Sequence, residues 1–462
     1  MKQKNTNVAL EVFRRAAHTV PAYRHFLKKH GIVPAQIKTD ADFARVPCVT
    51  KKDYLLSYPY RKLFPHGKVP PMISASSGSS GKPFYWPRGN AVEERGAEIH
   101  EQIFRDIFNI GKKRVLVVVC FSMGTWIAGT YTAACVRRIA DTGYPISVVT
   151  PGIEKEDILA ILSRLAPEFD MVIMTGYPPF LMDIATEAHA RRIPLKTLNM
   201  RLLFAGENFS EHWRESIHKL CGIRDALRGS IGIYGTADAA ILGHETPLSI
   251  YIRKRIAKNS SFRKKFLGAA PFVPTLVRYY PEYTHVEEVD SQLAFTVEAG
   301  IPLVRYTIGD MGRLFSPDAA AKLVPKSLHV FNAPLLALLG RKDVAVTFYA
   351  LNIYPENIKA GLEDKTTARA FSGKFVAKTV TTHNDRNQKL FITAELARGV
   401  RLSQLLARKA ERSLFNNLMR LNAEYRKLYR SIGDRALPRI RLVPFGDAAF
   451  DITRAKHRWF ES

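Results

Sequence analysis

The fold class is decided first by residues 114–120, a short apolar run with the sequence RVLVVVC. A run of this length without alternating polar positions is typical of a strand that is buried on both faces of a sheet. Similar runs follow at residues 145–150, 170–176, 200–205 and 230–234. Stretches typical of helices lie between them, for example at 157–165 and from Pro178 onward. This alternation predicts an α/β fold with right-handed crossovers and a mostly parallel sheet flanked by helices.

The pattern changes near residue 343, and a length of 462 residues suggests two or three domains. With 46% apolar residues, the chain can bury a sizeable core. Beyond residue 343 the sequence predicts a short strand, a helix from Pro355, strands at 375–383 and 390–395, a long basic helix at 402–430 and a last strand at 440–443. We therefore expect a large body, residues 1–343, and a small C-terminal α+β lid, residues 344–462.

The formal net charge of +27 is large and unevenly distributed. Residues 344–462 carry 22 Lys and Arg against 11 Asp and Glu, and a second basic cluster spans residues 253–265. Such surfaces attract nucleic acid, anionic lipid, phosphorylated cofactors or acidic proteins, although a solvated basic face is an equally simple interpretation. No zinc-finger or RNP-type signature is present, so the charge does not favour nucleic-acid recognition.

The cysteines are scattered: Cys48, Cys120, Cys135 and Cys221 form no CxxC pair. This usage fits a reducing compartment and argues against a disulfide framework or a zinc cluster. The first residues lack the apolar core of a secretory signal, so we expect a cytoplasmic protein. Residues 115–136 contain no charge and are long enough to cross a bilayer, but polar residues 122–125 interrupt them. A strand, a loop and a helix account for this segment better than a membrane span.

Residues 76–83, SSGSSGKP, form a loop with little side-chain bulk and one cation, Lys82. Glycine lets backbone amides turn toward an anion, and small hydroxyl groups add further donors. The loop could therefore wrap a polyphosphate, although a flexible linker has a similar composition. It is not a Walker loop, because only Ser79 and Ser80 separate Gly78 from Gly81.

Later segments form a constellation with this loop. They are YGTAD at 234–238, YTIGD at 306–310, GRKD at 340–343, NIYPENI at 352–358 and FDITRAKHR at 450–458, which contains Lys456. In this order and spacing they resemble the motifs of the adenylate-forming superfamily of acyl and aryl ligases. Tyr23, Arg24 and residues 46–53, VPCVTKKD, are similar to the phenylacetate–CoA ligase branch and its capsular-polysaccharide biosynthesis relatives.

The resemblance implies that a carboxylate attacks the α-phosphorus of ATP, so that an acyl-adenylate forms and pyrophosphate leaves. Cations and amide dipoles that neutralise the phosphates lower the barrier of such a step. The residues implied to hold the β- and γ-phosphates are Ser77, Gly78, Ser79, Ser80, Gly81 and Lys82. The residues implied to surround adenine are Tyr234, Gly235, Gly206 and Glu207.

By the same resemblance, Thr236 and Lys456 would contact the α-phosphate, which makes Lys456, Lys82 and Thr236 the expected catalytic residues. Asp238 would help to hold Mg²⁺, a hard cation that prefers carboxylate oxygen. Asp310 would accept hydrogen bonds from the ribose hydroxyls, and Arg341 would approach the ribose or a phosphate. Taken singly, Tyr234 could also be a core residue, Asp310 a turn residue and Arg341 a surface residue.

Asp343 lies where the family places a hinge, about which the lid rotates between an adenylating pose and one that admits the acceptor. Some positions depart from the family pattern. Asp238 stands where Glu is usual, and Ala455 precedes Lys456 where glycine is usual. Ala350 replaces a glycine of the pantetheine tunnel, next to Tyr349 where Arg is common, which bears on whether CoA is the acceptor.

By position, Phe121, Met123, Trp126 and Tyr177 should lie near the carboxylate pocket, where an aromatic lining would suit an aryl or medium acyl acid. Aromatic residues at strand ends are as often core residues, so both interpretations stay open. The leading hypothesis is an ATP- and Mg²⁺-dependent, AMP-forming ligase that transfers the acyl group to CoA or to an acidic carrier protein. The alternatives are transfer to an amine or sugar, as in capsular-polysaccharide biosynthesis, and a non-catalytic nucleotide-binding protein.

Overall fold

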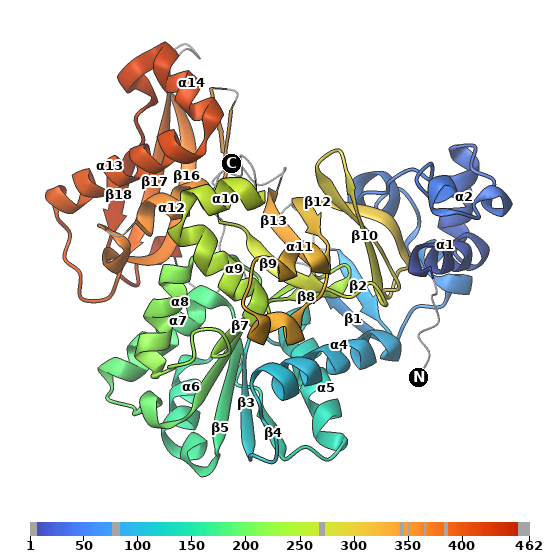
Figure 1. The fold of residues 1–462 in the computed structure, drawn as a ribbon, viewed down its shortest axis with the longest axis horizontal. Coiled ribbons are helices and arrows are strands. Elements are labelled where there is room, and N and C mark those ends of the chain that lie inside the picture. The colour runs from blue at the N-terminus through green and yellow to red at the C-terminus, as the bar shows by residue number, and fades with distance from the viewer. Residues whose placement is uncertain are drawn as a thin grey trace.

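One large sheet organises the body of the protein (Figure 1). The structure is a computed structural model that describes residues 7–75, 84–267, 273–341, 346–349, 351–364, 366–382 and 387–450. The strands of this sheet are β3 (Val115–Cys120), β4 (Ile146–Val149), β5 (Met171–Gly176), β6 (Met200–Ala205), β7 (Ser230–Thr236), β8 (Ala240–His244), β9 (Thr275–Tyr279), β10 (Thr284–Val289), β11 (Gln292–Val297), β12 (Leu303–Phe315) and β13 (Leu335–Arg341). Their spatial order is β10-β11-β12-β13-β9-β8-β7-β6-β5-β3-β4.

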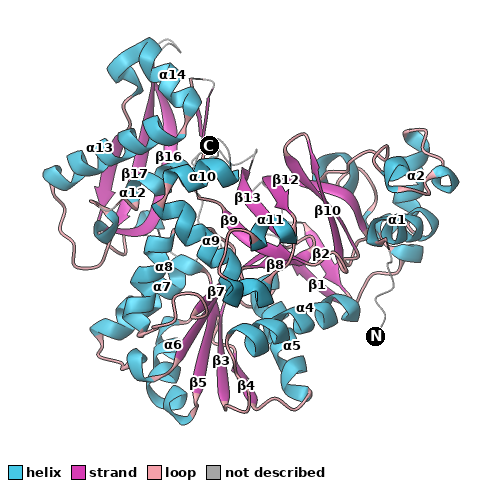
Figure 2. Cartoon of the chain, in the orientation of Figure 1, coloured by secondary structure: helices cyan, strands magenta, loops and turns pink. Residues whose placement is uncertain are grey.

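Strands β3 to β7 pair in parallel, as the alternating sequence pattern predicts. The helices that connect and cover them are α4 (Asn90–Gln102), α5 (Ile127–Asp141), α6 (Lys155–Ala160), α7 (Pro178–Ala190) and α8 (Glu211–Cys221). Figure 2 shows these helices on either side of the parallel strands. The predicted α/β class, with a large parallel region and flanking helices, is confirmed.

Strand β3 is buried on both faces, which explains its unbroken apolar sequence. Val117 and Val119 belong to the core cluster shared with α4 and α5. Leu116 and Val118 belong to the opposite cluster, shared with α6, α7 and α8. The uncharged segment 115–136 is thus a strand, a loop and the start of α5, as predicted. Within the described residues, no helix has the length and apolar character needed to cross a membrane.

The other half of the sheet is antiparallel, from β7 through β8, β9, β13, β12 and β11 to β10. Strand β13 lies between β9 and β12, although it is the last strand of this sheet in the sequence. The surrounding elements are α1 (Val8–Thr19), α2 (Pro21–Lys29), α3 (Asp40–Phe43), α9 (Pro247–Lys258), α10 (Ser260–Leu267), α11 (Pro317–Ala321) and the hairpin of β1 (Met72–Ala75) with β2 (Tyr85–Arg88). The sequence patterns did not predict this antiparallel extension.

The C-terminal part of the chain forms a smaller unit around its own core cluster, which extends from Val346 to Ala436. Its elements are β14 (Val346–Phe348), β15 (Leu351–Ile353), α12 (Pro355–Leu362), β16 (Phe371–Thr382), β17 (Asn387–Leu396), α13 (Gln404–Leu421), α14 (Ala423–Ile432) and β18 (Arg439–Val443). In Figure 1 this unit lies at the upper left, against α7, α8 and α9. We keep the name lid for it; the boundary at residue 343 lies outside the described residues and stays a prediction.

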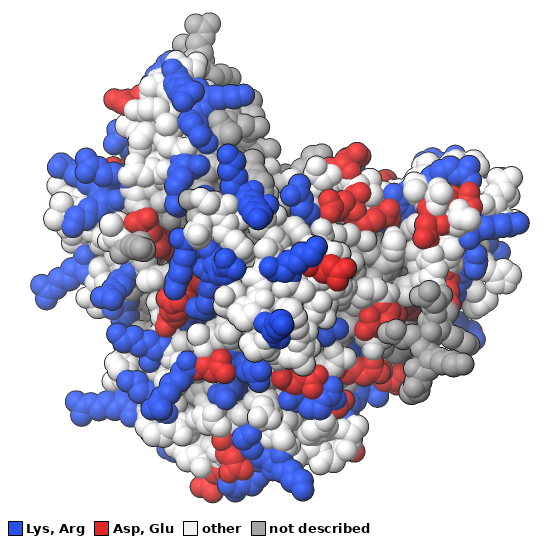
Figure 3. Space-filling model, viewed as in Figure 1, with Lys and Arg blue, Asp and Glu red and all other residues white. Residues whose placement is uncertain are grey.

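The basic helix predicted at 402–430 is two helices, α13 and α14, and the single-helix prediction was wrong. Asn422 between them has an extended backbone, with φ −109° and ψ 107°. Its side-chain oxygen accepts a hydrogen bond from the Tyr425 amide at 2.9 Å and caps α14. Asparagine favours such a cap over a helix interior because its side chain competes for backbone hydrogen bonds. Figure 3 shows Lys and Arg side chains over much of the visible lid surface.

Candidate active site

The predicted site residues gather where the parallel strands end. Tyr177 follows β5, Glu207 follows β6, and Thr236 is the last residue of β7. In open α/β sheets, ligands bind in the crevice beyond the carboxyl ends of the strands. The topology therefore brings motifs that are distant in sequence to one edge of the sheet.

Two tyrosine–aspartate hydrogen bonds join the YGTAD and YTIGD segments. The Tyr234 hydroxyl donates to Asp310 Oδ2, and the Tyr306 hydroxyl donates to Asp238 Oδ2, each at 2.5 Å. Because each bond connects β7 or the turn after it with β12, the two segments hold each other in place. Both aspartates were predicted as site residues; Tyr306 lies in the quoted YTIGD motif, but its hydrogen bond to Asp238 was not predicted.

The main chain at Asp310 lies opposite Arg341 of β13 in the antiparallel register. This pairing brings two predicted ribose-binding positions to neighbouring strands. Asp310 is buried, with an exposed fraction of 6%. A buried carboxylate of this kind is retained when it has hydrogen-bond donors, and Tyr234 supplies one of them.

Tight backbone turns require the glycines predicted at the site. A β-carbon on Gly235 would lie 2.7 Å from the Ala240 carbonyl oxygen, closer than a side chain can approach. The Thr236 hydroxyl accepts the Ala239 amide at 3.0 Å and so holds the turn that carries Asp238. Gly206 has a φ of +96°, a region that favours glycine, and it lies against the Tyr177 ring.

Glu207 connects the body to the lid. It accepts a hydrogen bond from the Tyr177 hydroxyl and forms an ion pair with Lys359 of α12. Lys359 Nζ also donates to the Asn208 carbonyl oxygen at 2.7 Å. The sequence predicted Glu207 from its motif but gave no role to Lys359, because contacts across two domains leave no local pattern.

A carboxylate of the lid, Glu356 of α12, lies close enough to Glu207 of this loop for their charges to interact. Burial raises the pKa of Glu356; Lys359 opposes this effect, whereas the negative charges of Glu207 and Asp310 add to it. One of its oxygens, Oε2, has no hydrogen-bond partner among the described residues. In this arrangement, therefore, α12 places one cation and one carboxylate against the loop predicted to surround adenine.

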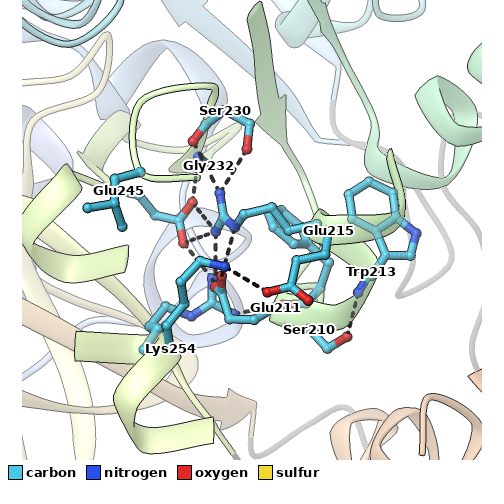
Figure 4. A network of polar contacts seen from close by, with 12 residues as sticks. Ser210, Glu211, Trp213, Glu215, Ser230, Gly232, Glu245 and Lys254 are labelled. Carbon is cyan, nitrogen blue, oxygen red and sulfur yellow. Dashed lines mark hydrogen bonds and ion pairs between the residues drawn. The ribbon is translucent and has the colours of Figure 1, made fainter. Parts of the chain in front are cut away.

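A buried network of charges contacts the backbone of the segment that follows Glu207 and Asn208 (Figure 4). Arg214 of α8 and Arg253 of α9 both bind the Glu245 carboxylate, at 2.8 and 2.5 Å. Arg253 also donates to the Phe209 carbonyl oxygen at 2.7 Å, which anchors the segment after Asn208. Burial favours the neutral form of Glu245, but the two guanidinium groups lower its pKa below the usual value. The network therefore keeps its charges and fixes the backbone of the loop.

The chain is similar in sequence to known ligases. The chain is 23% identical over 347 residues to phenylacetate-coenzyme A ligase of Pseudomonas putida, covering 75% of this chain and 72% of that protein. It is 21% identical over 353 residues to the phenylacetate-coenzyme A ligase of Aromatoleum evansii, covering 75% and 71%. No protein-family model matches the chain.

Solved structures show the same fold. A 2-hydroxyisobutyryl-CoA ligase in the postadenylation state aligns with a TM-score of 0.70, over 98% of this chain and 88% of that chain, at 16% identity. The acyl acid amido synthetase AtGH3.15 aligns with a TM-score of 0.61, over 98% and 90%, at 15% identity. The chain is thus similar in sequence to phenylacetate-coenzyme A ligases, and it shares its fold with a CoA ligase and an acyl acid amido synthetase.

Several positions that the resemblance to the adenylate-forming superfamily singles out lie outside the described residues. They are Ser77, Gly78, Ser79, Ser80, Gly81, Lys82, Asp343, Ala350 and Lys456. The described residues on either side of the Ser/Gly loop belong to the β1–β2 hairpin. Ala75 pairs with Tyr85 across the β1–β2 hairpin, and the Ala75 amide donates to the Thr125 carbonyl oxygen at 2.8 Å. The loop thus begins and returns beside the segment after β3.

The candidate carboxylate pocket is only partly assembled from the predicted residues. Phe121 is buried in the core cluster between the sheet and the α4–α5 layer, so it serves packing. Trp126 is partly buried at the start of α5, where its backbone forms a bridge with Ala75. Tyr177 is tied to Glu207. A nearby apolar hollow of about 490 Å³ is lined by Tyr60, Ile73, Ser74, Ala75, Tyr85 and Thr125.

The predicted magnesium ligand fits a cation that is shared with phosphates. Asp238 supplies carboxylate oxygen, and Tyr306 orients it from β12. Within the described residues, no group of three or more His, Cys, Asp or Glu side chains is arranged to hold a metal ion.

Proposed function

We propose that this protein is an AMP-forming ligase of the adenylate-forming superfamily that activates a carboxylic acid with ATP. The observation that carries the proposal is the pair of hydrogen bonds, Tyr234 to Asp310 and Tyr306 to Asp238, which joins the nucleotide motifs at the carboxyl edge of the sheet. A fold alone does not define a reaction, so the argument depends on this local chemistry.

In this proposal the residues at the sheet edge bind and orient the nucleotide. Tyr234 stacks on adenine beside the loop of Gly206 and Glu207, and Asp310 accepts hydrogen bonds from the ribose. Thr236 donates to the α-phosphate from a turn that its own hydroxyl stabilises. Mg²⁺, held by Asp238 and the phosphates, would neutralise charge during adenylation. Placing these donors in advance lowers the barrier, because they need not reorganise during the step.

The Ser/Gly loop and the lid complete the proposed machinery. Residues 77–82 would enclose the β- and γ-phosphates, and Lys456 would approach the α-phosphate when the lid closes. The β1–β2 hairpin supports this role, since it returns the loop to the same edge of the sheet. We place the domain boundary and the hinge at Asp343, so that the lid carries Lys456 toward and away from the site.

For the acceptor, we propose a thiol, either of CoA or of an acidic carrier protein. Phenylacetate-coenzyme A ligases are relatives, and the Lys- and Arg-rich lid surface would attract an anionic acceptor. An amine acceptor is the second candidate, because an acyl acid amido synthetase shares the fold over nearly the whole chain. The substrate is proposed to be an aryl or medium acyl acid, with Tyr177 and Trp126 at the edge of its pocket.

ATP–pyrophosphate exchange across a panel of aryl, acyl and amino acids tests the proposal. We expect exchange with a subset of acids and its loss in Asp310→Ala and Lys456→Ala. CoA, a carrier protein and amines are then offered to the active acid to identify the acceptor. A protein that binds ATP but exchanges pyrophosphate with none of the acids would contradict the ligase proposal and favour a nucleotide-binding role.

A further inference from the structure

The lid touches the body through a bulge in β16. Phe371 pairs with Leu396, and Phe375 pairs with Ala394, so four steps along β16 oppose only two along β17. Gly373, within the bulge, has a φ of +94°, a backbone region that favours glycine. A β-carbon there would lie 3.9 Å from the Trp213 side chain of α8, so the bulge contacts the body. Bulges redirect side chains out of the regular alternation of a strand.

The bulge carries Lys374 into a buried contact with α7. Lys374 Nζ lies 2.9 Å from Asp183 Oδ2 of the body and 3.3 Å from Glu395 Oε2 of the lid. The exposed fractions are 6% for Lys374, 4% for Asp183 and 0% for Glu395. The other Glu395 oxygen accepts the Gly446 amide at 3.0 Å, within the lid. The body contributes Asp183 to this charge cluster, together with the more exposed Lys155, whose Nζ lies 4.0 Å from Asp183 Oδ2.

The energetics of this contact suit a reversible interaction. Burial raises the pKa of Asp183, and the positive charges of Lys374 and Lys155 only partly offset that effect. The free-energy cost of removing two charges from water can cancel the attraction between them in a buried ion pair. A buried charge that is left without its partner, by contrast, strongly destabilises the protein. If the lid moved away, Lys374 would keep Glu395 as its partner and Asp183 would return to water. The pair can thus define a lid position without holding the lid permanently.

We infer that Lys374 and Asp183 form a positional lock, which holds the lid in the arrangement seen here and opens when the lid turns. Both are positioning residues that act through the lid and not on a substrate. Helix α7 begins directly after Tyr177, so the helix that receives the lid also begins at the candidate acid pocket. The inference rests on the proposed function only where it says that the lid moves during the reaction. The docking of the lid on the body can be measured without a reaction.

The lock is tested by replacing its body partner, Asp183→Asn, in the full chain. This change keeps the shape of the side chain and leaves the Lys374–Glu395 pair of the lid intact. The matched control is Glu187→Gln, one helical turn later on α7, whose lid partner Arg398 is 41% exposed. By small-angle X-ray scattering without ligands, we expect a larger radius of gyration for Asp183→Asn and no change for the control.

Lys374→Gln removes the same pair from the lid side and should have the same effect. The double variant should open the lid no further than either single variant, because both remove one interaction. Circular dichroism and thermal unfolding establish that each variant is folded, and if one is not, the other carries the test. Scattering that stays unchanged in a folded variant would overturn the lock.

Kinetics separate a positional role from a structural one. We expect the ratio of pyrophosphate exchange to overall product formation to change by about threefold or more in Asp183→Asn, since the variant alters the balance of lid positions. The ratio should stay constant in Glu187→Gln. An equal loss of both rates, with unchanged scattering, would show a merely structural contact. A wild type without exchange on any acid would refute the ligase proposal and leave the scattering test valid.

Discussion

Two buried charge clusters of this protein differ in what surrounds them. The first, Arg214, Glu245 and Arg253, lies entirely within the body, where every charge has several partners. The second, Asp183 with Lys374 and Glu395, is divided between body and lid. Both are nearly inaccessible to water.

The difference indicates that buried charges can either fix a structure within one domain or form a contact between two domains that can separate. In the body cluster no rigid movement of a domain can separate the partners, so the charges fix the loop of Asn208 and Phe209. In the divided cluster, one partner leaves with the lid. Similar chemistry thus gives a fixed support in one place and a separable contact in the other.

The largest expected effect comes from breaking the body cluster with Glu245→Gln. It would leave the Arg214 and Arg253 guanidinium groups with Glu211 but without the Glu245 carboxylate that both also bind, and we expect a loss of about 3–5 kcal/mol in the free energy of unfolding. Urea denaturation measures this loss. The control is Glu215→Gln, whose carboxylate is 56% exposed and pairs with Lys254, and it should cost less than about 1 kcal/mol. Equal losses in the two variants would contradict the expectation that the buried Glu245 carboxylate stabilises the body more than the exposed Glu215 carboxylate does.

Acid should weaken the body, which buries His218 and His244. Burial lowers the pKa of His218 to about 3 and that of His244 to about 3, whereas the described part of the lid contains no histidine. Unfolding raises these pKa values toward about 6.5, so the unfolded chain binds more protons and stability falls as the pH drops below that value. Each histidine should cost about 2 kcal/mol at pH 5.

Urea denaturation at pH 7 and pH 5, followed by tryptophan fluorescence, checks this dependence. All the described tryptophans, Trp86, Trp126 and Trp213, belong to the body. His218→Gln should show a smaller loss between the two pH values than the wild type, and the exposed His25→Gln should not. An identical pH dependence in all three proteins would contradict a neutral buried His218.

Strain in the β16 bulge gives a smaller effect. Gly373→Ala places a side chain at a φ of +94° and should cost about 1–2 kcal/mol. Because the bulge carries Lys374, we expect the lid to undock before the body unfolds, seen as faster amide hydrogen exchange at residues 371–382. Gly89→Ala, at a negative φ with open space around it, is the control. If amide hydrogen exchange at these residues is unchanged in Gly373→Ala, the bulge does not contribute to the docking of the lid on the body.

The smallest effect is expected for the exposed ion pair at the same interface. Arg398 and Glu187 have side-chain exposed fractions of 41% and 21%, and water and salt screen their attraction. Arg398→Gln should change the free energy of unfolding by less than about 1 kcal/mol. Thermal unfolding at low and high salt measures this; a larger change would show that burial does not separate strong from weak contacts here.

The sequence predicted the parts of the fold that repeat with a regular period. Strands β3 to β7 follow from apolar runs; β3 and β5 are buried along their whole length, and β6 coincides with the predicted residues 200–205. The antiparallel half escaped prediction because strands such as β9 and β13 pair across long sequence separations. The break between α13 and α14 depends on one capping residue, Asn422, within a continuous helical pattern.

For the site, motifs located Tyr234, Asp310 and Glu207, whereas contacts between segments did not follow from sequence. Tyr306 lies at the start of a predicted motif, but its hydrogen bond to Asp238 depends on the pairing of distant strands. Lys359 and Lys374 are two of many basic residues in the lid, and their roles follow only from their ion pairs with Glu207 and Asp183 of the body. For Phe121 the sequence left a pocket and a core position equally open, and the structure buries it in a core cluster.

The position of β13 has a consequence for the order in which the protein can be synthesised and folded. This strand links β9 to β12, yet it is the last strand of the large sheet to leave the ribosome. Until residue 341 has emerged, the nascent chain can form two separate sheets but not the continuous one. The sheet edge that carries the candidate site spans both halves, and it is therefore completed only after β13 has been translated. A ribosome that stalls before β13 would release a protein with unpaired strand edges on either side of the gap, prone to aggregate.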